Sequence, residues 1–487
     1  MTKQPVLPNF PPTFIATSKR SLQALIRSRR SALVAHSISG YDSCFESVLP
    51  SGWLAHIDPS IRHRSFGAIP VFWTWLSQIF ENNASCAKGV SRVQAWYEAA
   101  NLPVPSGGTS AYCRARQRLS PAFLDQIHRK VLDVTRQRTR LEDRWNGLTL
   151  KAIDGSSVQL LDTEANQRAY PQPSAQSPGC GFPVMGIHGL LNLSNGTWEA
   201  IDVSDFREGD AKMALKMTGH LREGDLLLGD RAYCSYPLIC SALEQGAEVL
   251  FRLHGSRHRK LDWRRGKHLS KHARQVVWKK PFYQEASPLT RVEWSALPET
   301  ITVRLIKMKS EDRTGQLRNL VVATTLLDVE RYDETELFEL YARRWEIEVR
   351  FRDLKTSLGM DLLRARSPEM ARKTIQILAI AYNLIRAVMQ AVATVQESPL
   401  KEVGFRSILD RLITFRSRFR ELRRTVRQSR GFFDDFINIC ARQKLQIRPH
   451  RSEPRALKRR PKNYALLTET RGLFEEKPHR SRHRKSA

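Results

Sequence analysis

Five runs of apolar residues between positions 146 and 255 predict the strands of one sheet. Some alternate apolar and polar residues, as half-buried strands do, and others are continuously apolar, as in strands buried on both faces. Two segments with helical spacing, DAKMALKMTGHL and YPLICSALEQG, lie before and after the fourth run. The order is three strands, helix, strand, helix, strand, so we expect an α/β fold with a mixed sheet flanked by helices. The five runs are LTLKAID, MGIHGLLNL, TWEAIDVSDF, GDLLLGD and AEVLFRLH.

The pattern changes on both sides of this segment. The chain before it is mostly helical, and strands such as ETITVRLIKMK after it indicate a β-rich insertion in the core. A helical stretch follows and contains TIQILAIAYNLIRAVMQAVA, expected to be a core helix too short and too interrupted to span a membrane. Five regions are predicted: a helical N-terminal DNA-binding domain (1–145), a core (146–255), the insertion (256–335), a helical second part of the core (336–400) and a basic C-terminal region with a tail (401–487).

The charge balance narrows the choice of partner. The chain has 79 Lys and Arg against 49 Asp and Glu, a net charge of +30. An excess of this size indicates a polyanionic partner, most simply nucleic acid. The N-terminus lacks the apolar core of a signal peptide, and seven scattered cysteines form no CxxC pair. We therefore expect a reduced, cytoplasmic, DNA-binding chain without a zinc module or a membrane anchor.

Two segments are candidates for direct DNA contact. Residues 86–118 read as helix, turn, helix, and an ordinary helical hairpin with a solvated basic face is an equal alternative. The segment from Arg252 to Lys280 has 11 Lys and Arg, one acid and interleaved tryptophans, which favours phosphate contact over a solvated loop. The candidate DNA-binding residues are Tyr112, Arg114, Arg116 and Gln117 in the first segment and Arg264 and Arg265 in the second.

Three acidic residues are the candidate catalytic groups. Asp154 and Asp230 each end an apolar run, where an open α/β sheet presents its functional groups. Glu348 lies in YARRWEIEVRFRDLK, and on a helix it shares a sector about 60° wide with Tyr341, Arg344 and Lys355. Alone, this alignment is equally consistent with surface ion pairs. Three carboxylates from two strand ends and a helix suit two Mg²⁺ ions, with Mn²⁺ able to substitute, for phosphodiester cleavage.

These residues together resemble a known family. Asp154, Asp230 and Glu348, with Tyr341, Arg344, Glu348 and Lys355 spaced as Y-x2-R-x3-E-x6-K, are similar to the DDE transposases of bacterial insertion sequences that have the Y-R-E-K signature. The resemblance covers roughly residues 60–470. It implies an RNase H-like catalytic core interrupted by a β-insertion, which agrees with the order of elements given above.

The resemblance also implies an activity. It implies binding to the terminal inverted repeats of the element, metal-dependent cleavage at its ends and joining of the 3′ ends to target DNA by a homodimer. Tyr341, Arg344 and Lys355 would hold the DNA end, and Trp345 would stack beside it. Relatives in this group excise through a DNA hairpin, with an aromatic residue of the insertion receiving a flipped base. The candidates for that residue are Trp263, Trp278 and Trp294.

Two other functions explain part of the same sequence. An RNase H-like nuclease would use the same carboxylates without end specificity or strand transfer. A non-catalytic DNA-binding regulator would explain the net charge but would leave the three placed carboxylates without a purpose. Nearby polar residues are expected to have structural roles: Asp162, Asp205 and Asp225 in turns and caps, and His188 packed in a strand.

Overall fold

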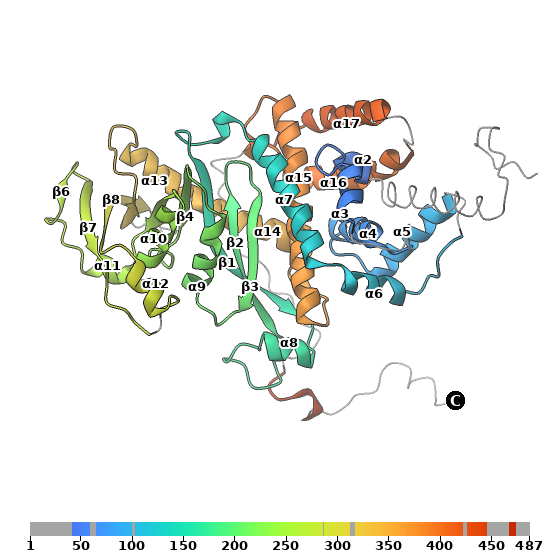
Figure 1. Cartoon of the computed structure of the whole chain (residues 1–487), viewed down its shortest axis with the longest axis horizontal. Helices are drawn as coiled ribbons and strands as arrows, with labels where there is room; N and C mark the ends of the chain where they lie inside the picture. Colours follow the sequence, from blue (N-terminus) through green and yellow to red (C-terminus); the bar gives the residue numbers. More distant parts are fainter. Residues whose placement is uncertain are drawn as a thin grey trace, which may run out of the picture. The chain divides into compact units, whose positions relative to one another are not determined.

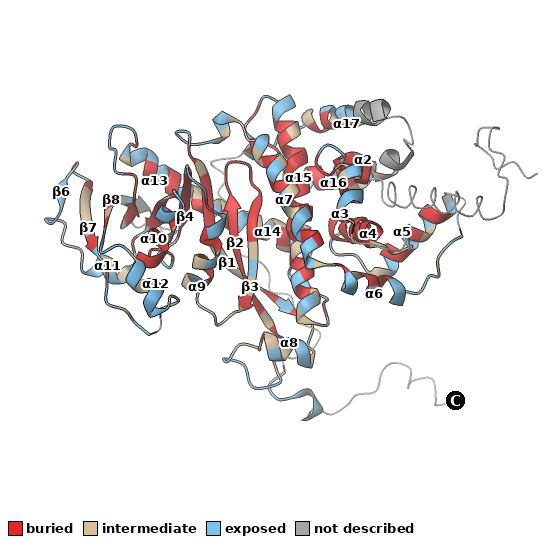
Figure 2. Ribbon diagram, viewed as in Figure 1, coloured by how far each residue is buried: buried red, intermediate tan, exposed pale blue. Residues whose placement is uncertain are grey.

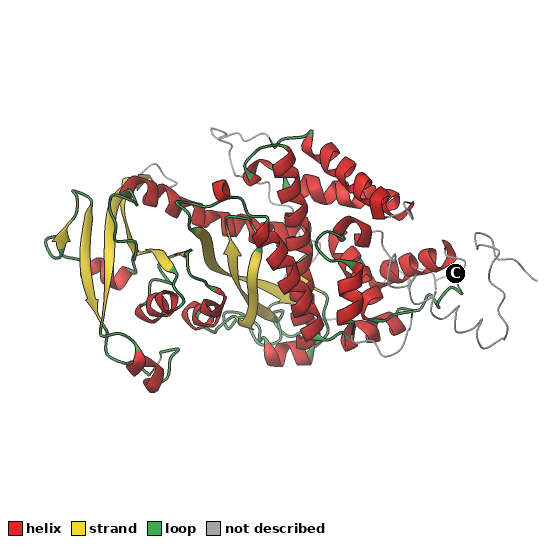
Figure 3. Cartoon of the chain, turned by 45° about the horizontal axis from the view of Figure 1, so that its top comes forward, coloured by secondary structure: helices red, strands yellow, loops and turns green. Residues whose placement is uncertain are grey.

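The computed structural model describes residues 41–58, 65–99, 103–285, 287–311, 317–421, 426–445 and 467–473. The chain divides into two compact units. One comprises Met1–Gln78, Ala84–Phe123 and Thr414–Phe433, and the other Ile79–Asn83, Leu124–Ile413 and Asp434–Ala487. Most of the expected basic tail lies outside the described residues. Strands occur only in the second unit among the described residues, as the yellow arrows of Figure 3 show.

The first unit is helical where it is described. Its core is rich in aromatic side chains that are almost completely buried, including Phe45, Phe72, Trp73, Trp75 and Trp96. Rings pack directly on one another, with the centroids of Phe72 and Trp73 5.0 Å apart. Its helices are α2 (Tyr41–Phe45), α3 (Ser51–Ile57), α5 (Cys86–Ala99), α6 (Ser110–Arg118) and most of α4 (Ala68–Phe80), together with parts of α16 (Phe405–Glu421) and α17 (Val426–Ala441).

The second unit is built on an open mixed sheet. The predicted strands form in the predicted order, as β1 (Thr149–Leu160), β2 (Val184–Asn192), β3 (Trp198–Asp205), β4 (Asp225–Gly229) and β5 (Glu248–Arg252). Strands β1, β2 and β3 pair antiparallel, while β4 is parallel to both β1 and β5. The resulting spatial order, β3-β2-β1-β4-β5, places β1 and β4 side by side (Figure 1).

The strands of the segment 256–335 extend this sheet. Strand β9 (Leu317–Thr324) pairs antiparallel with β5, and β8 (Thr300–Glu311), β7 (Ala273–Lys279) and β6 (Lys267–His268) follow in turn. Val303, Leu305 and Ala323 also belong to the same hydrophobic cluster as β4 and β5. The inserted strands therefore share both the backbone pairing and the core of the sheet to which they are attached.

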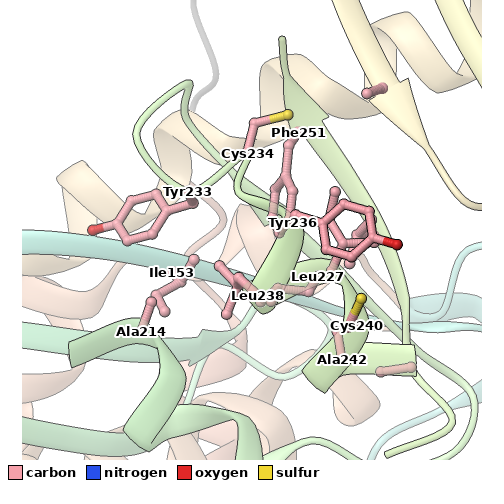
Figure 4. Close-up of a cluster of buried hydrophobic side chains, with 14 of the residues drawn as sticks. Ile153, Ala214, Leu227, Tyr233, Cys234, Tyr236, Leu238, Cys240, Ala242 and Phe251 are labelled. Atoms are coloured by element: carbon pink, nitrogen blue, oxygen red, sulfur yellow. The ribbon is translucent and has the colours of Figure 1, made fainter. Parts of the chain in front are cut away.

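Helices cover both faces of the sheet near β1. On one face, α9 (Asp210–Met217) and α10 (Tyr236–Glu244) contribute Ala214, Met217, Leu238 and Ile239 to a buried cluster that includes Ile153 (Figure 4). On the other face, α14 (Glu346–Arg352) is held by packing of Phe351 on Trp198, with ring centroids 4.6 Å apart. Because side chains alternate along a strand, Asp154 points to the face opposite Ile153, toward α14.

Helix α15 (Pro368–Val395) corrects one expectation from the sequence. It has 28 residues and is long and apolar enough to cross a membrane by length and composition, so it is neither too short nor too interrupted. Its most apolar 18 residues are 89% buried inside the protein. Figure 2 draws much of α15 in the red of buried residues. Lys373 and Arg386, which interrupt the apolar pattern in the sequence, are themselves buried. The expected position as a core helix is therefore confirmed, although the reason given for it was wrong.

Strand β1 is also longer than its apolar run. It continues for six residues beyond Asp154 because its second half pairs with β2 and, at Gln159 and Leu160, with β10 (Leu362–Leu363). Asp154 therefore lies within a strand rather than at its end. The remaining elements are α7 (Pro121–Gln137), α8 (Glu164–Ala169), α11 (Gly255–Arg259), α12 (Arg291–Ala296), α13 (Glu334–Ala342), α16 (Phe405–Glu421) and α17 (Val426–Ala441), with 3-10 turns at Leu141–Asp143, Thr218–His220, Leu400–Glu402 and Arg471–Leu473.

Candidate active site

The register of three parallel strands brings the two candidate aspartates together. Ala152 of β1 lies opposite Leu228 of β4, so two residues further along Asp154 is level with Asp230. Neighbouring strands are about 5 Å apart. Strand β4 ends at Gly229, and Asp230 immediately follows, its Oδ1 accepting a hydrogen bond of 2.7 Å from the backbone N–H of Ala232. The two carboxylates therefore occupy adjacent strands where β4 turns away from β1.

Glu348 and Arg344 approach the aspartates from a helical run. After α13 the run tightens into a 3-10 turn at Arg343–Trp345, continues as α14 and widens into a π-helical turn at Asp353–Ser357. One guanidinium nitrogen, Arg344 Nη1, lies 3.5 Å from Glu348 Oε1 and 3.9 Å from Asp154 Oδ2. The Arg344 side chain is only 10% exposed, and its Nε is buried without a hydrogen-bond partner among the described residues. Arg344 is thus an internal counter-ion for two of the three acids.

The charges of the three acids act on one another through the pKa of Asp154. Burial raises the pKa of Asp154 to about 6, and the charges of Glu348 and Asp230 act in the same direction. A hydrogen bond from the Gly155 backbone and the charge of Arg344 oppose the rise in pKa. The site therefore holds more negative charge than one arginine neutralises.

The raised pKa of Asp154 predicts an unusual pH dependence of stability. Its folded-state pKa of about 6 lies above the ordinary value of 3.8, so the folded chain holds this proton more tightly than the unfolded chain. The stability that this proton confers is present below about pH 4 and is lost as the pH rises to about 6, up to about 3 kcal/mol. In metal-free protein, Asp154→Asn should therefore raise the melting temperature by a few degrees at pH 7.5 and leave it unchanged at pH 4. Asp202→Asn, an exposed aspartate on β3, is the control, and equal melting temperatures at pH 7.5 would contradict the prediction.

The other residues of the Y-R-E-K signature lie along the same run in different environments. Tyr341 is buried; burial raises its pKa to about 12, while the charges of Arg344 and Arg252 and a hydrogen bond with Arg344 lower it. Trp345 is 49% exposed, with the Arg344 guanidinium 5.1 Å from its ring centroid. Lys355 lies in the π-helical turn, where helix geometry departs from the uniform 100° per residue assumed for the sequence. The structure thus places Tyr341 and Arg344 near the acids. Lys355 lies seven residues after Glu348, a turn and a half or more further along the same helical segment.

Three polar residues near the strands that carry the acids were not found from the sequence. Arg252 ends β5, and because Phe251 pairs with Gly229 of β4, Arg252 is level with Asp230. Its nearness to Asp230 follows from strand register, which only the order β1-β4-β5 reveals. Asp210 begins α9, where an acidic residue is ordinary, and Tyr233 looks like one more core aromatic. For these two, no sequence signal distinguished a role at the site from a structural one.

The candidate DNA-binding residues of α6 have mixed environments. Tyr112 is fully buried and its hydroxyl donates a 2.5 Å hydrogen bond to Gln78, so it packs inside the first unit instead of facing solvent. Arg116 is partly buried, with its guanidinium 3.9 Å above the Trp75 ring. Arg114 and Gln117 are exposed. Only the last two present their side chains fully to solvent.

In the segment after β5, the two candidate arginines are exposed, whereas the three candidate tryptophans are buried or partly buried. Arg264 and Arg265 are exposed, and both pair with Asp262. Trp278 is buried beneath the Arg257 guanidinium, 4.0 Å away. Trp263 and Trp294 are partly buried, and the indole N–H of Trp294 donates to the Pro281 carbonyl. In this conformation none of the three tryptophans presents a fully exposed ring.

The chemistry of the donors fits a hard divalent cation. Asp154, Asp230 and Glu348 offer carboxylate oxygens, the ligands that Mg²⁺ and Mn²⁺ prefer, and Glu348 is 43% exposed. Among the described residues, no group of three His, Cys, Asp or Glu side chains is already arranged around one metal position. Arg344 stands between two of the three carboxylates, so side chains must rearrange before all three can share a cation.

Comparisons with known proteins identify the segment that contains this site. The family described as "Transposase DDE domain" matches residues 145–384. Transposase InsG for insertion sequence element IS4, from Escherichia coli (strain K12), is 25% identical over 284 residues, 58% of this chain and 61% of that protein. Putative transposase InsL for insertion sequence element IS186A, from the same strain, is 26% identical over 274 residues, 50% of this chain and 67% of that protein. A piggyBac transposase synaptic complex with hairpin DNA covers 85% of this chain and 86% of its own at a TM-score of 0.40 and 10% identity, a likeness too remote to define a shared site.

The fold and the site define an α/β domain whose open mixed sheet presents carboxylates on adjacent parallel strands beside a helix. Residues 145–384 match the transposase DDE domain family, and the relatives named above are transposases of bacterial insertion sequences. It matches 61% of the length of the IS4 transposase. The resemblance expected from the sequence is confirmed at the level of the family.

Proposed function

We propose that the protein is a DDE transposase of a bacterial insertion sequence. It binds the terminal inverted repeats, hydrolyses a phosphodiester bond at each end of the element and joins the freed 3′-hydroxyl groups to target DNA. Water is the nucleophile in the first step and the 3′-hydroxyl in the second, so no covalent protein–DNA intermediate forms. The observation that carries the proposal is the convergence of Asp154, Asp230 and Glu348 within the matched transposase domain.

The finer assignment of the fold belongs to this proposal. The order β3-β2-β1-β4-β5, with the first three strands antiparallel and the last two parallel to β1, supports an RNase H-like core. The five-region division, with a DNA-binding domain before residue 145 and an insertion at 256–335, remains a prediction. So do action as a homodimer, a cytoplasmic location at the nucleoid and excision through a hairpin.

Each residue at the site has a distinct task in the proposed reaction. Asp154, Asp230 and Glu348 would hold two Mg²⁺ ions, which when bound stabilise negative charge on the phosphate and the attacking and leaving oxygens. Arg344 lies beside the acids. Its guanidinium can exchange its ion pairs with Glu348 and Asp154 for an ion pair with a phosphate of the DNA end. Arg252 is level with Asp230 in the sheet. Its guanidinium would add a second positive charge for the phosphate backbone of the DNA. Tyr341, Trp345 and Lys355 would complete the grip on the end.

One cleavage experiment tests the proposal. The purified protein is incubated with a plasmid containing the DNA that flanks its gene, with Mg²⁺ or with EDTA, and the products are mapped to the nucleotide. We expect Mg²⁺-dependent nicks at the two ends of the element and joined products when target DNA is added. Hairpin ends among the products would establish the excision route.

The same experiment separates the two alternatives. Cuts that depend on Mg²⁺ but fall anywhere in the plasmid would replace the proposal with an RNase H-like nuclease. Binding to the ends without any cut, in Mg²⁺ and in Mn²⁺, would indicate a DNA-binding regulator. Either result would overturn transposase activity for this chain.

A further inference from the structure

A β-bulge in β3 turns one large side chain to the face of the sheet where α14 lies. Along β2 and β3, consecutive residues pair one to one until Leu190 meets Ala200. The next residue of β2 meets Trp198, which leaves Glu199 as an extra residue in β3. By simple alternation Trp198 would share the face of Ala200, which belongs to the hydrophobic cluster that α9 and α10 cover. The extra residue re-aims Trp198, as bulges beside active sites commonly do, and its ring meets α14 on the opposite face.

Two long helices fix Trp198 in this orientation. The side chain of Asn383 on α15 accepts a hydrogen bond of 2.8 Å from the Trp198 backbone N–H and donates one of 3.0 Å to its carbonyl. His128 Nε2, on α7, lies 3.0 Å from the same carbonyl oxygen. Tyr382 meets the Trp198 ring edge-on, with centroids 6.2 Å apart, and Trp198 is fully buried. The ring therefore presents a fixed surface to α14.

Gly189 leaves the space that this arrangement needs. Gly189 of β2 pairs directly with Asp154 of β1, so a side chain at position 189 would stand on the same face as the Asp154 carboxylate. A Cβ atom placed there would overlap Trp198 Cζ3 and lie 3.0 Å from Phe351 Cζ. Both rings thus rest on the bare backbone of the residue opposite Asp154. The absence of a side chain at this one position lets α14 approach the sheet as closely as it does.

The depth of this packing bears directly on the acids. Phe351 follows Glu348 by three residues on α14, so the two side chains project from neighbouring positions of the helix. The Phe351 ring is buried, with its centroid 4.6 Å from that of Trp198. On the same helical run, Arg344 Nη1 lies 3.5 Å from Glu348 Oε1 and 3.9 Å from Asp154 Oδ2. A shift of α14 away from the sheet would lengthen the second of these distances.

We propose that Gly189 and Trp198 are positioning residues for the cleavage reaction, which together set the distance of α14 from β1 and so the place of Glu348 relative to Asp154. The inference rests on the function proposed above and adds to it two residues outside the acid set. Both act only through the position of α14, since neither offers a ligand for a hard cation. A misplacement of about 1 Å at a catalytic group can slow an enzyme by about 100-fold.

The test compares cleavage with the local stability of α14. The methyl group introduced by Gly189→Ala displaces the rings of Trp198 and Phe351, so single-turnover cleavage at saturating end DNA should slow by about 10- to 100-fold. Affinity for end DNA should stay within about twofold, because phosphate contacts elsewhere supply most of it. In DNA-free protein, the backbone amides of α14 should exchange with deuterium about tenfold faster, while those of α10 stay unchanged. Gly189→Ala should slow Glu348→Gln by a smaller factor than it slows the wild type, because it acts through Glu348.

Two variants control for the chemical change and for lost stability. Gly219→Ala adds the same methyl group at a position where a Cβ meets nothing within 4 Å. Val303→Ala removes buried methyl groups from β8, in the cluster on the other face of the sheet, and so lowers stability without contact with α14. At a temperature where both are folded, each should cleave within about twofold of the wild-type rate.

The outcomes separate this inference from the proposed function. Wild-type cleavage by folded Gly189→Ala overturns the inference, and so does equal slowing by Val303→Ala, which would attribute the effect to stability. If Gly189→Ala does not fold, Trp198→Phe, which leaves a gap beneath Phe351, is measured in the same way, and wild-type values for cleavage and exchange overturn the inference. If the wild-type protein never cleaves DNA, the proposed function fails. Faster exchange confined to α14 then still supports the role of Gly189 and Trp198 in placing that helix, and unchanged exchange overturns it.

Discussion

Replacing Asp230 by Asn is expected to slow cleavage at the ends of the element by about 1,000-fold, equivalent to about 4 kcal/mol of transition-state stabilisation. Asp230 is positioned by strand register next to Asp154, so the loss of its charge removes one of the three carboxylates that the proposed reaction uses. The backbone N–H of Ala232 binds Oδ1, and an Asn side chain retains an oxygen that can accept this hydrogen bond. The substitution therefore removes charge with little disturbance of the loop. Single-turnover cleavage of end DNA in Mg²⁺ measures the effect, and Glu348→Gln should show a loss of similar size.

A matched control exists on β3, two strands away from β1 in the strand order of the sheet and not paired with β4. Asp205 ends β3, and its Oδ1 also accepts a hydrogen bond from a backbone N–H two residues on, that of Arg207, at 3.1 Å. Asp205→Asn makes the same chemical change in the same kind of turn, away from the acids, and should leave the cleavage rate within about twofold of wild type. Near-normal cleavage by folded Asp230→Asn would exclude it from catalysis, whereas equal losses in both variants would attribute the effect to structure.

Arg344→Gln is expected to strengthen the binding of Mn²⁺ and to slow the cleavage of DNA. In the wild-type protein without DNA, the guanidinium lies near Glu348 and Asp154, two of the carboxylates proposed to hold the cation. Its removal should tighten Mn²⁺ binding to the DNA-free protein by about tenfold or more, because the positive charge beside the acids is lost. Cleavage of end DNA should nevertheless fall by about 100-fold, since the same charge is needed at a DNA phosphate.

Arg343 provides the control for this pair of measurements. It precedes Arg344 in the 3-10 turn but pairs with Glu346, with Nε 2.8 Å from Oε1, and does not pair with the catalytic acids. Arg343→Gln should leave the affinity for Mn²⁺ unchanged. If Arg344→Gln bound Mn²⁺ no more tightly than wild type, the ion pairs with Asp154 and Glu348 would not compete with cations. If it also cleaved DNA normally, Arg344 would have no part in the reaction.

The parts of the site that the sequence predicted are those tied to local pattern. Asp154 and Asp230 follow apolar runs, and Glu348 shares a helical sector with Arg344, so residue spacing was sufficient to select them. The end of β1 was misplaced because Gly155 to Ser157 look like a turn, and only pairing with β2 shows that the strand continues. Tyr112 appeared to be a DNA-facing residue because an aromatic residue on a short basic helix can point to either side, and its burial depends on the partner Gln78.

The remaining parts depend on tertiary arrangement. Arg252 becomes a neighbour of Asp230 only through the parallel pairing of β4 and β5. Asp210 has the appearance of a helix-initiating acid, and nothing local indicates that α9 carries it to Gly155. The π-helical turn around Lys355 likewise departs from the regular helix on which the angular estimate was based. The local sequence pattern predicts which helix or strand a residue belongs to. Which helices and strands contact one another can be predicted only when the order of the strands in the sheet is known.

The position of β9 has a consequence for how the protein is made. Strand β9 seals the edge of β5, and the helical run bearing Glu348 follows β9 in the chain. Protein chains emerge from the ribosome N-terminus first and fold progressively. A growing chain can therefore pair β1, β4 and β5 and bring both aspartates together while Glu348 has not yet been synthesised. The acid set becomes complete only after the sheet edge can be closed, so growing chains that end before Glu348 cannot assemble all three acids.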